Sequence, residues 1–260
     1  MGLFWGNIQQ FAGAPPAPVF PTSGLTSYWR FDETSGTAAA DQIGYADMTL
    51  EGNVSFAANG KNNYCATVAG ATTRTIYGGD KYNWERTQPW TMSGWLKFPV
   101  GNTSIATFMS KESTSGSGYR GWAMLWVNSP TNAGSEMYII NNYSSNNYIL
   151  RGSTTDYETG STTVNDGLWH MITFTYDGTS KASGVTNYYD TVNISAPTYG
   201  KDTLTATIIS AAAVDFCIGG REQGGRGMSA GNIDECAMWD RVLSTEEIAA
   251  VYNSGAGLFY

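Results

Sequence analysis

Side chains suited to acid–base or nucleophilic chemistry are few in this sequence. It holds one histidine, His170, and three cysteines, Cys65, Cys217 and Cys236. The cysteines are too widely spaced for a metal knuckle, and they allow at most one disulfide. We expect Cys65 to be free, and Cys217 and Cys236 to be buried thiols or, as the alternative, a bridged pair. No carboxylate or nucleophile adjoins His170 in the sequence, so we expect its ring to order neighbouring loops through hydrogen bonds.

The carboxylates offer no obvious hydrolytic pair. A retaining glycosidase needs two carboxyl groups about 5 Å apart across its substrate. The best candidates, Asp234 and Glu235, are adjacent, and adjacent residues of a strand point to opposite faces of the sheet. We therefore expect no catalytic function. Hydrolysis by carboxylates from separate strands remains an alternative.

Residues 141–157 have the composition of a binding surface. Tyrosine supplies flat area with few rotatable bonds, while asparagine and serine adapt their hydrogen bonds to a ligand. The loop at residues 222–229 is a second candidate rim. An ordinary hairpin with a polar outer face is the alternative, because asparagine and serine also favour turns. The candidate carbohydrate-binding residues are Tyr143, Asn146, Tyr148, Arg151 and Tyr157.

Composition excludes several classes of partner. The chain has 260 residues and a formal net charge of -8, and its 14 lysines and arginines are spread singly. It therefore offers no basic stripe for nucleic acid. No apolar run reaches the roughly 18 residues of a membrane span, and the first residues lack the basic start of a signal peptide. We expect neither a membrane span nor ordinary secretion.

The elements that would position these side chains are short strands. Apolar or alternating runs recur between clusters of glycine, asparagine, aspartate and serine, which is typical of an antiparallel β-sandwich. One short helix closes the chain, because Ser244 and Glu247 form a capping box and Gly255 follows as a stop. The predicted strands are Leu25–Phe31, Thr91–Phe98, Ser104–Lys111, Gly121–Val127, Glu136–Ile140, Trp169–Tyr176, Thr186–Val192, Val214–Gly219 and Ile233–Trp239.

The first residues differ from the rest of the chain. No charged residue occurs before Arg30, and the proline-rich stretch 12–18 can neither continue a helix nor pair as a central strand. We predict an extended N-terminal arm at residues 1–23 and one sandwich domain at residues 24–260. The apolar residues of the arm are expected to dock on a partner, or alternatively to fold back onto the domain. They are Leu3, Phe4, Trp5, Ile8 and Phe11.

Four segments in chain order resemble the laminin G-like, concanavalin A-like lectin/glucanase superfamily. The resemblance implies an all-β jelly-roll sandwich. It does not imply one function, because this fold hosts lectins, hydrolases and structural modules. The four segments are residues 25–37, 91–97, 166–178 and 231–244.

The resemblance also implies calcium as a cofactor. Asp32, Asp41 and Asp234 would supply hard oxygen ligands at one end of the sandwich. The alternative is that these carboxylates cap turns and accept loop amide hydrogens.

These features lead us to expect a non-catalytic structural protein exposed on a virus particle, such as a bacteriophage capsid decoration or fibre protein. Its arm would anchor it to other virion proteins at the virion surface, and its lectin-like domain would face outward toward cell-surface glycans. The first alternative is a stand-alone bacterial carbohydrate-binding module or adhesin, extracellular or on the cell surface. A glycoside hydrolase is the second.

Overall fold

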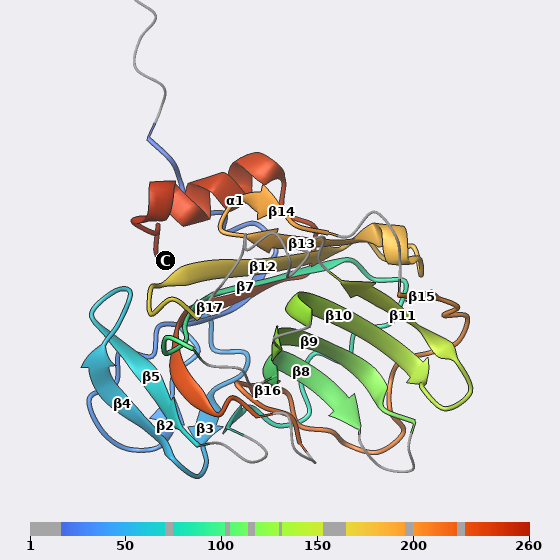
Figure 1. Ribbon diagram of the computed structural model, residues 1–260, viewed down its shortest axis with the longest axis horizontal. Coiled ribbons are helices and arrows are strands. Elements are labelled where there is room, and N and C mark those ends of the chain that lie inside the picture. Colours follow the sequence, from blue (N-terminus) through green and yellow to red (C-terminus); the bar gives the residue numbers. More distant parts are fainter. Residues whose placement is uncertain are drawn as a thin grey trace, which may run out of the picture.

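Two antiparallel sheets pack face to face in the computed structural model (Figure 1). The structure describes residues 17–70, 75–101, 105–113, 118–129, 132–152, 165–195, 200–222 and 227–260. The architecture confirms the predicted β-sandwich with one short C-terminal helix.

The first sheet has eight strands within the described ranges. Its order is β14–β13–β12–β7–β17–β5–β4, and β1 also pairs with β17. The bounds are β1 Leu25–Trp29, β4 Val54–Asn59, β5 Tyr64–Ala69, β7 Trp90–Lys97, β12 His170–Tyr176, β13 Val185–Tyr189, β14 Val192–Asn193 and β17 Ala230–Trp239.

The second sheet has nine strands within the same ranges. Its order is β15–β11–β10–β9–β8–β16–β6–β3–β2. The bounds are β2 Ala38–Ala39, β3 Met48–Leu50, β6 Ile76–Tyr77, β8 Ile105–Ser113, β9 Arg120–Ser129, β10 Asn132–Asn142, β11 Asn147–Gly152, β15 Lys201–Asp202 and β16 Cys217–Ile218.

Aromatic rings fill the space between the sheets. Alternation along β9 turns Trp122, Met124 and Trp126 inward, and all three belong to the main core. The ring of Trp84 stacks on Trp90 with centroids 5.3 Å apart, and on Trp122 at 6.1 Å. Burial of these rings removes a large apolar area from water, and this burial stabilises the sandwich.

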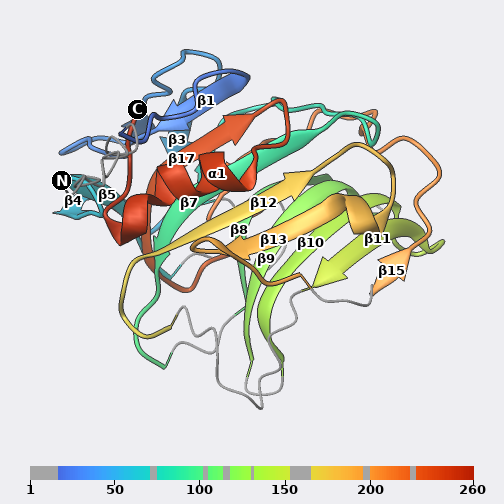
Figure 2. The ribbon, with the colours of Figure 1, turned by 90° about the horizontal axis from the view of Figure 1, so that it is seen from above.

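A second apolar cluster lies on the outer face of the eight-stranded sheet, under helix α1 (Thr245–Tyr252). The predicted capping box is present, with Ser244 and Glu247 each satisfying the other's backbone N–H. Tyr252 stacks on Trp95 of β7 at 5.7 Å, so the helix overlies this sheet (Figures 1 and 2). Short 3-10 turns occur at Ala182–Gly184 and Asn253–Gly255.

The three cysteines are free and buried, as expected for unbridged thiols. Cys217 lies in β16 of the nine-stranded sheet, whereas Cys236 lies in β17 of the other sheet. The last two predicted strands are therefore not neighbours in one sheet.

No helix in the described part of the chain combines the length and hydropathy needed to cross a membrane.

Candidate functional site: an aromatic pocket on the nine-stranded sheet

A pocket of about 130 Å³ opens on the outer face of the nine-stranded sheet. Met137 and Ile139 of β10 point into the core, so the alternate residues Tyr138 and Ile140 face outward. Strands β8, β9 and β10 lie side by side (Figure 1), and each of them supplies lining residues of the pocket. The lining residues are Glu112, Tyr119, Leu125, Tyr138, Ile140, Tyr143 and Arg221.

Four tyrosines form a connected group at the pocket. Tyr143 meets the ring of Tyr119 edge-on at 5.9 Å and stacks on Tyr148 at 4.8 Å. Tyr148 in turn stacks on Tyr138 at 6.5 Å. The backbone N–H of Tyr143 donates to the carbonyl of Gly118, which ties the turn after β10 to the loop before β9. The rings are therefore positioned by sheet register and one loop contact.

An ion pair closes one wall of the pocket. Arg221 donates to the carboxylate of Glu112 at 2.8 Å, and their side chains are 12% and 4% exposed. The guanidinium also lies 5.7 Å from the centre of the Tyr119 ring. Ser110 of β8 donates to the carbonyl of Gly220, which places Arg221 beside this strand. The pocket thus combines flat rings with one acceptor and one donor group.

The structure brings together some of the predicted sugar-binding residues and separates others. Tyr143 lines the pocket, and Tyr148 is buried beneath it. Asn146 is exposed in the turn before β11, where it has a φ of 57°, and it does not line the pocket. Arg151 shares the inward face of β11 with Ile149 and points away from the pocket. Tyr157 lies outside the described residues.

Sequence reasoning missed Glu112, Tyr119, Tyr138 and Arg221. Only the neighbouring loop 222–229 hinted at one of them, because it starts directly after Arg221.

Asp41, a candidate calcium ligand, is surrounded by hydrogen-bond donors. Its carboxylate accepts from the N–H groups of Tyr28, Ile43, Tyr45 and Ala46 at 2.9–3.0 Å. The hydroxyl of Ser27 donates to it at 2.5 Å. This carboxylate therefore caps the loop at residues 41–46 against β1.

Asp32 and Asp234 hold another loop. Asp32 accepts from the N–H of Tyr64 at 3.0 Å, and Asp234 accepts from the N–H groups of Lys61 and Asn62 at 2.7 and 3.1 Å. Among the residues that the structure describes, no three acidic, histidine or cysteine side chains are placed to hold a metal ion. The hydrogen bonds of the three candidate carboxylates match the alternative, turn capping, and nothing in the structure tests whether they also bind calcium.

The expectation that Asp234 and Glu235 point to opposite faces is wrong. A register shift interrupts β17 after Asp234, and Glu235 has a φ of 48°. As a result both side chains reach Asn62, Asp234 at its N–H and Glu235 at its side-chain amide. Burial, with the charge of Glu235, raises the pKa of Asp234 to about 9, and burial raises that of Glu235 to about 7.

His170 connects two loops, as predicted. Its ring nitrogens lie 3.2 Å from Asp166 and 3.3 Å from Asp190, and the ring stacks on Tyr189 at 4.6 Å. Burial alone lowers the pKa of His170, but hydrogen bonds and charge from the two aspartates raise it overall.

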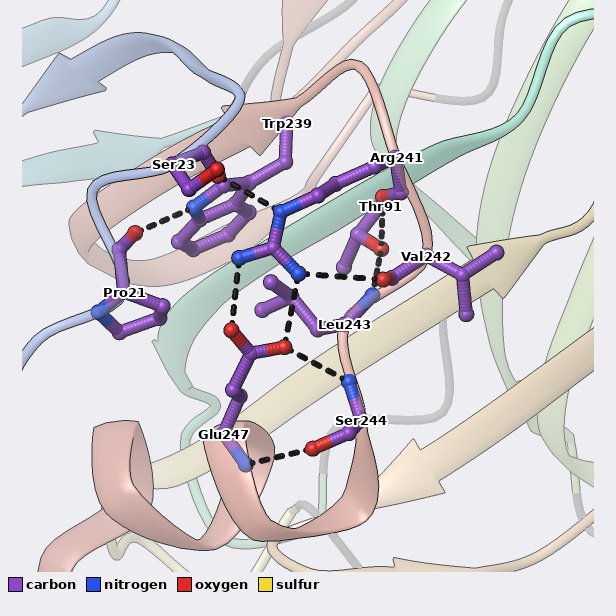
Figure 3. Close-up of polar contacts among 9 residues, drawn as sticks. All are labelled: Pro21, Ser23, Thr91, Trp239, Arg241, Val242, Leu243, Ser244 and Glu247. Atoms are coloured by element: carbon purple, nitrogen blue, oxygen red, sulfur yellow. Dashed lines mark hydrogen bonds and ion pairs between the residues drawn. The ribbon is translucent and has the colours of Figure 1, made fainter.

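The last residues of the predicted arm are fixed to the domain (Figure 3). The indole N–H of Trp239 donates to the carbonyl of Pro21 at 2.7 Å, and Arg241 donates to that of Ser23 at 2.7 Å. Arg241 also forms a two-pronged pair with Glu247 of α1. The chain therefore enters the domain on the α1 side. The five apolar residues expected to dock, Leu3, Phe4, Trp5, Ile8 and Phe11, lie outside the described residues.

Comparison with known proteins identifies the family of the sandwich. Residues 59–249 match the family model described as the concanavalin A-like lectin/glucanases superfamily. No curated protein matches the sequence significantly.

Solved structures with the same fold come from several sources. The binding domain of paraclostridial mosquitocidal protein 1 is 12% identical with a TM-score of 0.65, over 89% of this chain and 52% of that one. Trypanosoma rangeli sialidase in complex with sialic acid is 13% identical with a TM-score of 0.61, over 94% and 36%. Domain 4 of an extracellular arabinanase from Geobacillus stearothermophilus, in complex with arabinotriose, is 17% identical with a TM-score of 0.57, over 87% and 97%.

The chain spans about half of that mosquitocidal binding domain and about a third of the sialidase, but nearly all of the arabinanase domain. At such low identity these likenesses show the fold alone.

Proposed function

The chain belongs to the concanavalin A-like lectin/glucanase superfamily, and on that premise we propose that it is a non-catalytic glycan-binding module. The observation that carries the proposal is the pocket at Tyr119, Tyr138 and Tyr143, with Glu112 and Arg221 in its wall. Aromatic faces pack against the C–H groups of a sugar ring, while charged and hydroxyl groups bind its hydroxyls. A similar domain of an arabinanase has been solved with arabinotriose, which supports the same class of ligand.

The acidic residues around the pocket support a non-catalytic role. Glu112 is the one carboxylate among the described lining residues, and it is paired with Arg221. Glycoside hydrolysis normally needs two carboxylates flanking the scissile bond. Asp234 and Glu235 are both buried and are engaged by the loop at residues 60–64, so they offer no accessible pair.

Replacing Tyr143 with alanine tests the proposal. The ring is 43% exposed and borders the pocket, so its loss removes sugar-packing area and little core. We expect about a fivefold weaker affinity for the glycan that binds best on an array, equivalent to about 1 kcal/mol. Titration calorimetry with that glycan gives the affinity.

Tyr45→Ala is the matched control, because Tyr45 is 49% exposed and lies outside the pocket. Equal affinities of the two variants for that glycan, or no glycan binding by the unmodified protein, would refute the proposal. Release of reducing sugar from a polysaccharide would instead show a hydrolase.

We further propose that the module is displayed on a virus particle, as a bacteriophage capsid decoration or fibre protein would be. The placement of the arm supports this. Phe20 packs in the outer cluster with Trp239 and α1, on the eight-stranded sheet, whereas the pocket opens on the other sheet. An anchor at residues 1–16 would therefore leave the pocket facing away from the particle.

Removing residues 1–16 should separate anchoring from folding. The truncation keeps Phe20 and Pro21, which contact the domain, so we expect an unchanged melting temperature. We expect at least a tenfold loss of incorporation into particles, measured by co-sedimentation. Normal incorporation would contradict the anchor and favour a stand-alone carbohydrate-binding module or adhesin.

A further inference from the structure

We infer that the pocket selects uncharged sugars and rejects sugars that carry a carboxylate. The inference rests on the proposed glycan-binding function and concerns the class of glycan. The observation behind it is the charge balance of the pocket wall.

Arg221 and Glu112 neutralise each other inside the pocket. Their closest atoms are 2.8 Å apart, and both side chains are largely removed from solvent. Among the described lining residues, Arg221 is the one cation and Glu112 the one anion, so the wall has no net charge. The nearby Lys201 lies 5.9 Å from the Tyr148 ring and does not line the pocket.

A carboxylate entering this pocket would meet Glu112 beside the guanidinium. Charges interact strongly where the side chains are this well buried, so repulsion from Glu112 offsets the attraction of Arg221. The ligand carboxylate would also lose its hydration without gaining an unpaired cation. Recognition of an anionic sugar usually employs an arginine that is free to form two parallel hydrogen bonds with it.

A neutral sugar suits the same wall. Each hydroxyl both donates and accepts, so neighbouring hydroxyls can bind Glu112 and Arg221 together without separating the pair. The pocket is small, at about 130 Å³, so it suits a single terminal sugar better than an extended glycan. The tyrosine rings would then contact the C–H face of that terminal sugar.

Matched sugars test the selectivity with the unmodified protein. The probes are immobilised glycans ending in galactose or galacturonic acid, glucose or glucuronic acid, and lactose or sialyllactose, together with arabinotriose. Within each pair we expect the neutral member to bind at least tenfold more tightly. Preference for the acidic members would overturn this inference and leave glycan binding intact. Absence of binding to every probe would overturn both.

Glu112→Gln supplies an independent test. The amide keeps the size of the side chain but removes the negative charge beside Arg221, so we expect the preference within a pair to shift at least tenfold toward the acidic sugar. Glu246→Gln changes the net charge equally on the exposed surface of α1 and should shift nothing. An unshifted preference in a folded Glu112→Gln variant would contradict the role of the pair. If that variant fails to fold, the comparison with the unmodified protein decides the question.

Discussion

Replacing Asp41 with alanine is expected to lower the free energy of unfolding by about 3–5 kcal/mol. Asp41 is 6% exposed, and five donors converge on its carboxylate. Alanine would leave these donors unsatisfied in a buried site. The same carboxylate also ends a chain in which the hydroxyl of Tyr82 donates to Ser27, and Ser27 donates to Asp41.

Urea unfolding of Asp41→Ala and Asp47→Ala measures this difference. Asp47 lies in the same loop and accepts one hydrogen bond, from the N–H of Asp41, but its side chain is exposed. We expect its loss to cost about 1 kcal/mol or less. A cost for Asp41→Ala no larger than this control would contradict the capping role.

A chelator separates capping from calcium binding. Because backbone donors occupy Asp41, Asp32 and Asp234, we expect the unmodified protein to melt at the same temperature with and without EDTA. A bound ion present at 100 times its dissociation constant would add about 2.7 kcal/mol, which would appear as a clear fall in melting temperature on chelation.

The sandwich could be predicted because its central strands alternate regularly. The predicted runs Thr91–Phe98 and Trp169–Tyr176 correspond to β7 and β12, and no end differs by more than one residue. Strands at sheet edges gave weaker signals. Buried and exposed residues do not alternate regularly along β4 (Val54–Asn59), because a register shift occurs within this strand.

Asparagine and tyrosine misdirected the prediction at residues 147–152. The composition predicts a binding surface here, with an ordinary hairpin as the alternative, and the segment forms β11 of a hairpin with β10, in which alternate residues face the core. Only the outward face of β11, which carries Tyr148, therefore contributes to the pocket. Arg151 was misplaced because the hairpin register, which decides the face on which each residue lies, does not follow from the composition of the segment.

The pairing of Glu112 with Arg221 in the pocket wall could not be predicted from the sequence. Glu112 and Arg221 are separated by 109 residues, and they meet only because β16 pairs with β8. The convergence of Asp234 and Glu235 was equally hidden, since it depends on a left-handed backbone conformation at Glu235 rather than on any residue pattern. Long-range strand pairing and local bulges decide both arrangements.

Gly121→Ala is expected to destabilise the protein by about 3 kcal/mol or more and to disable the pocket. Gly121 lies in β9 opposite Glu112 of β8, with a φ of 133° that side chains rarely adopt. A β-carbon there would lie 1.8 Å from the carbonyl oxygen of Lys111. Because that neighbour is backbone, the two strands would have to separate, which would move Glu112 away from Arg221.

Gly152→Ala is the matched control on the same sheet, since a β-carbon there would meet nothing closer than 3.9 Å. We expect its free energy of unfolding to lie within about 0.5 kcal/mol of that of the unmodified protein, and its glycan affinity to be unchanged. For Gly121→Ala, measured below its melting temperature, we expect at least a tenfold loss of glycan affinity. Full affinity in a destabilised but folded Gly121→Ala variant would show that binding does not depend on the register between β8 and β9. The pocket at Glu112 would then not be the glycan site, because its wall is set by that register.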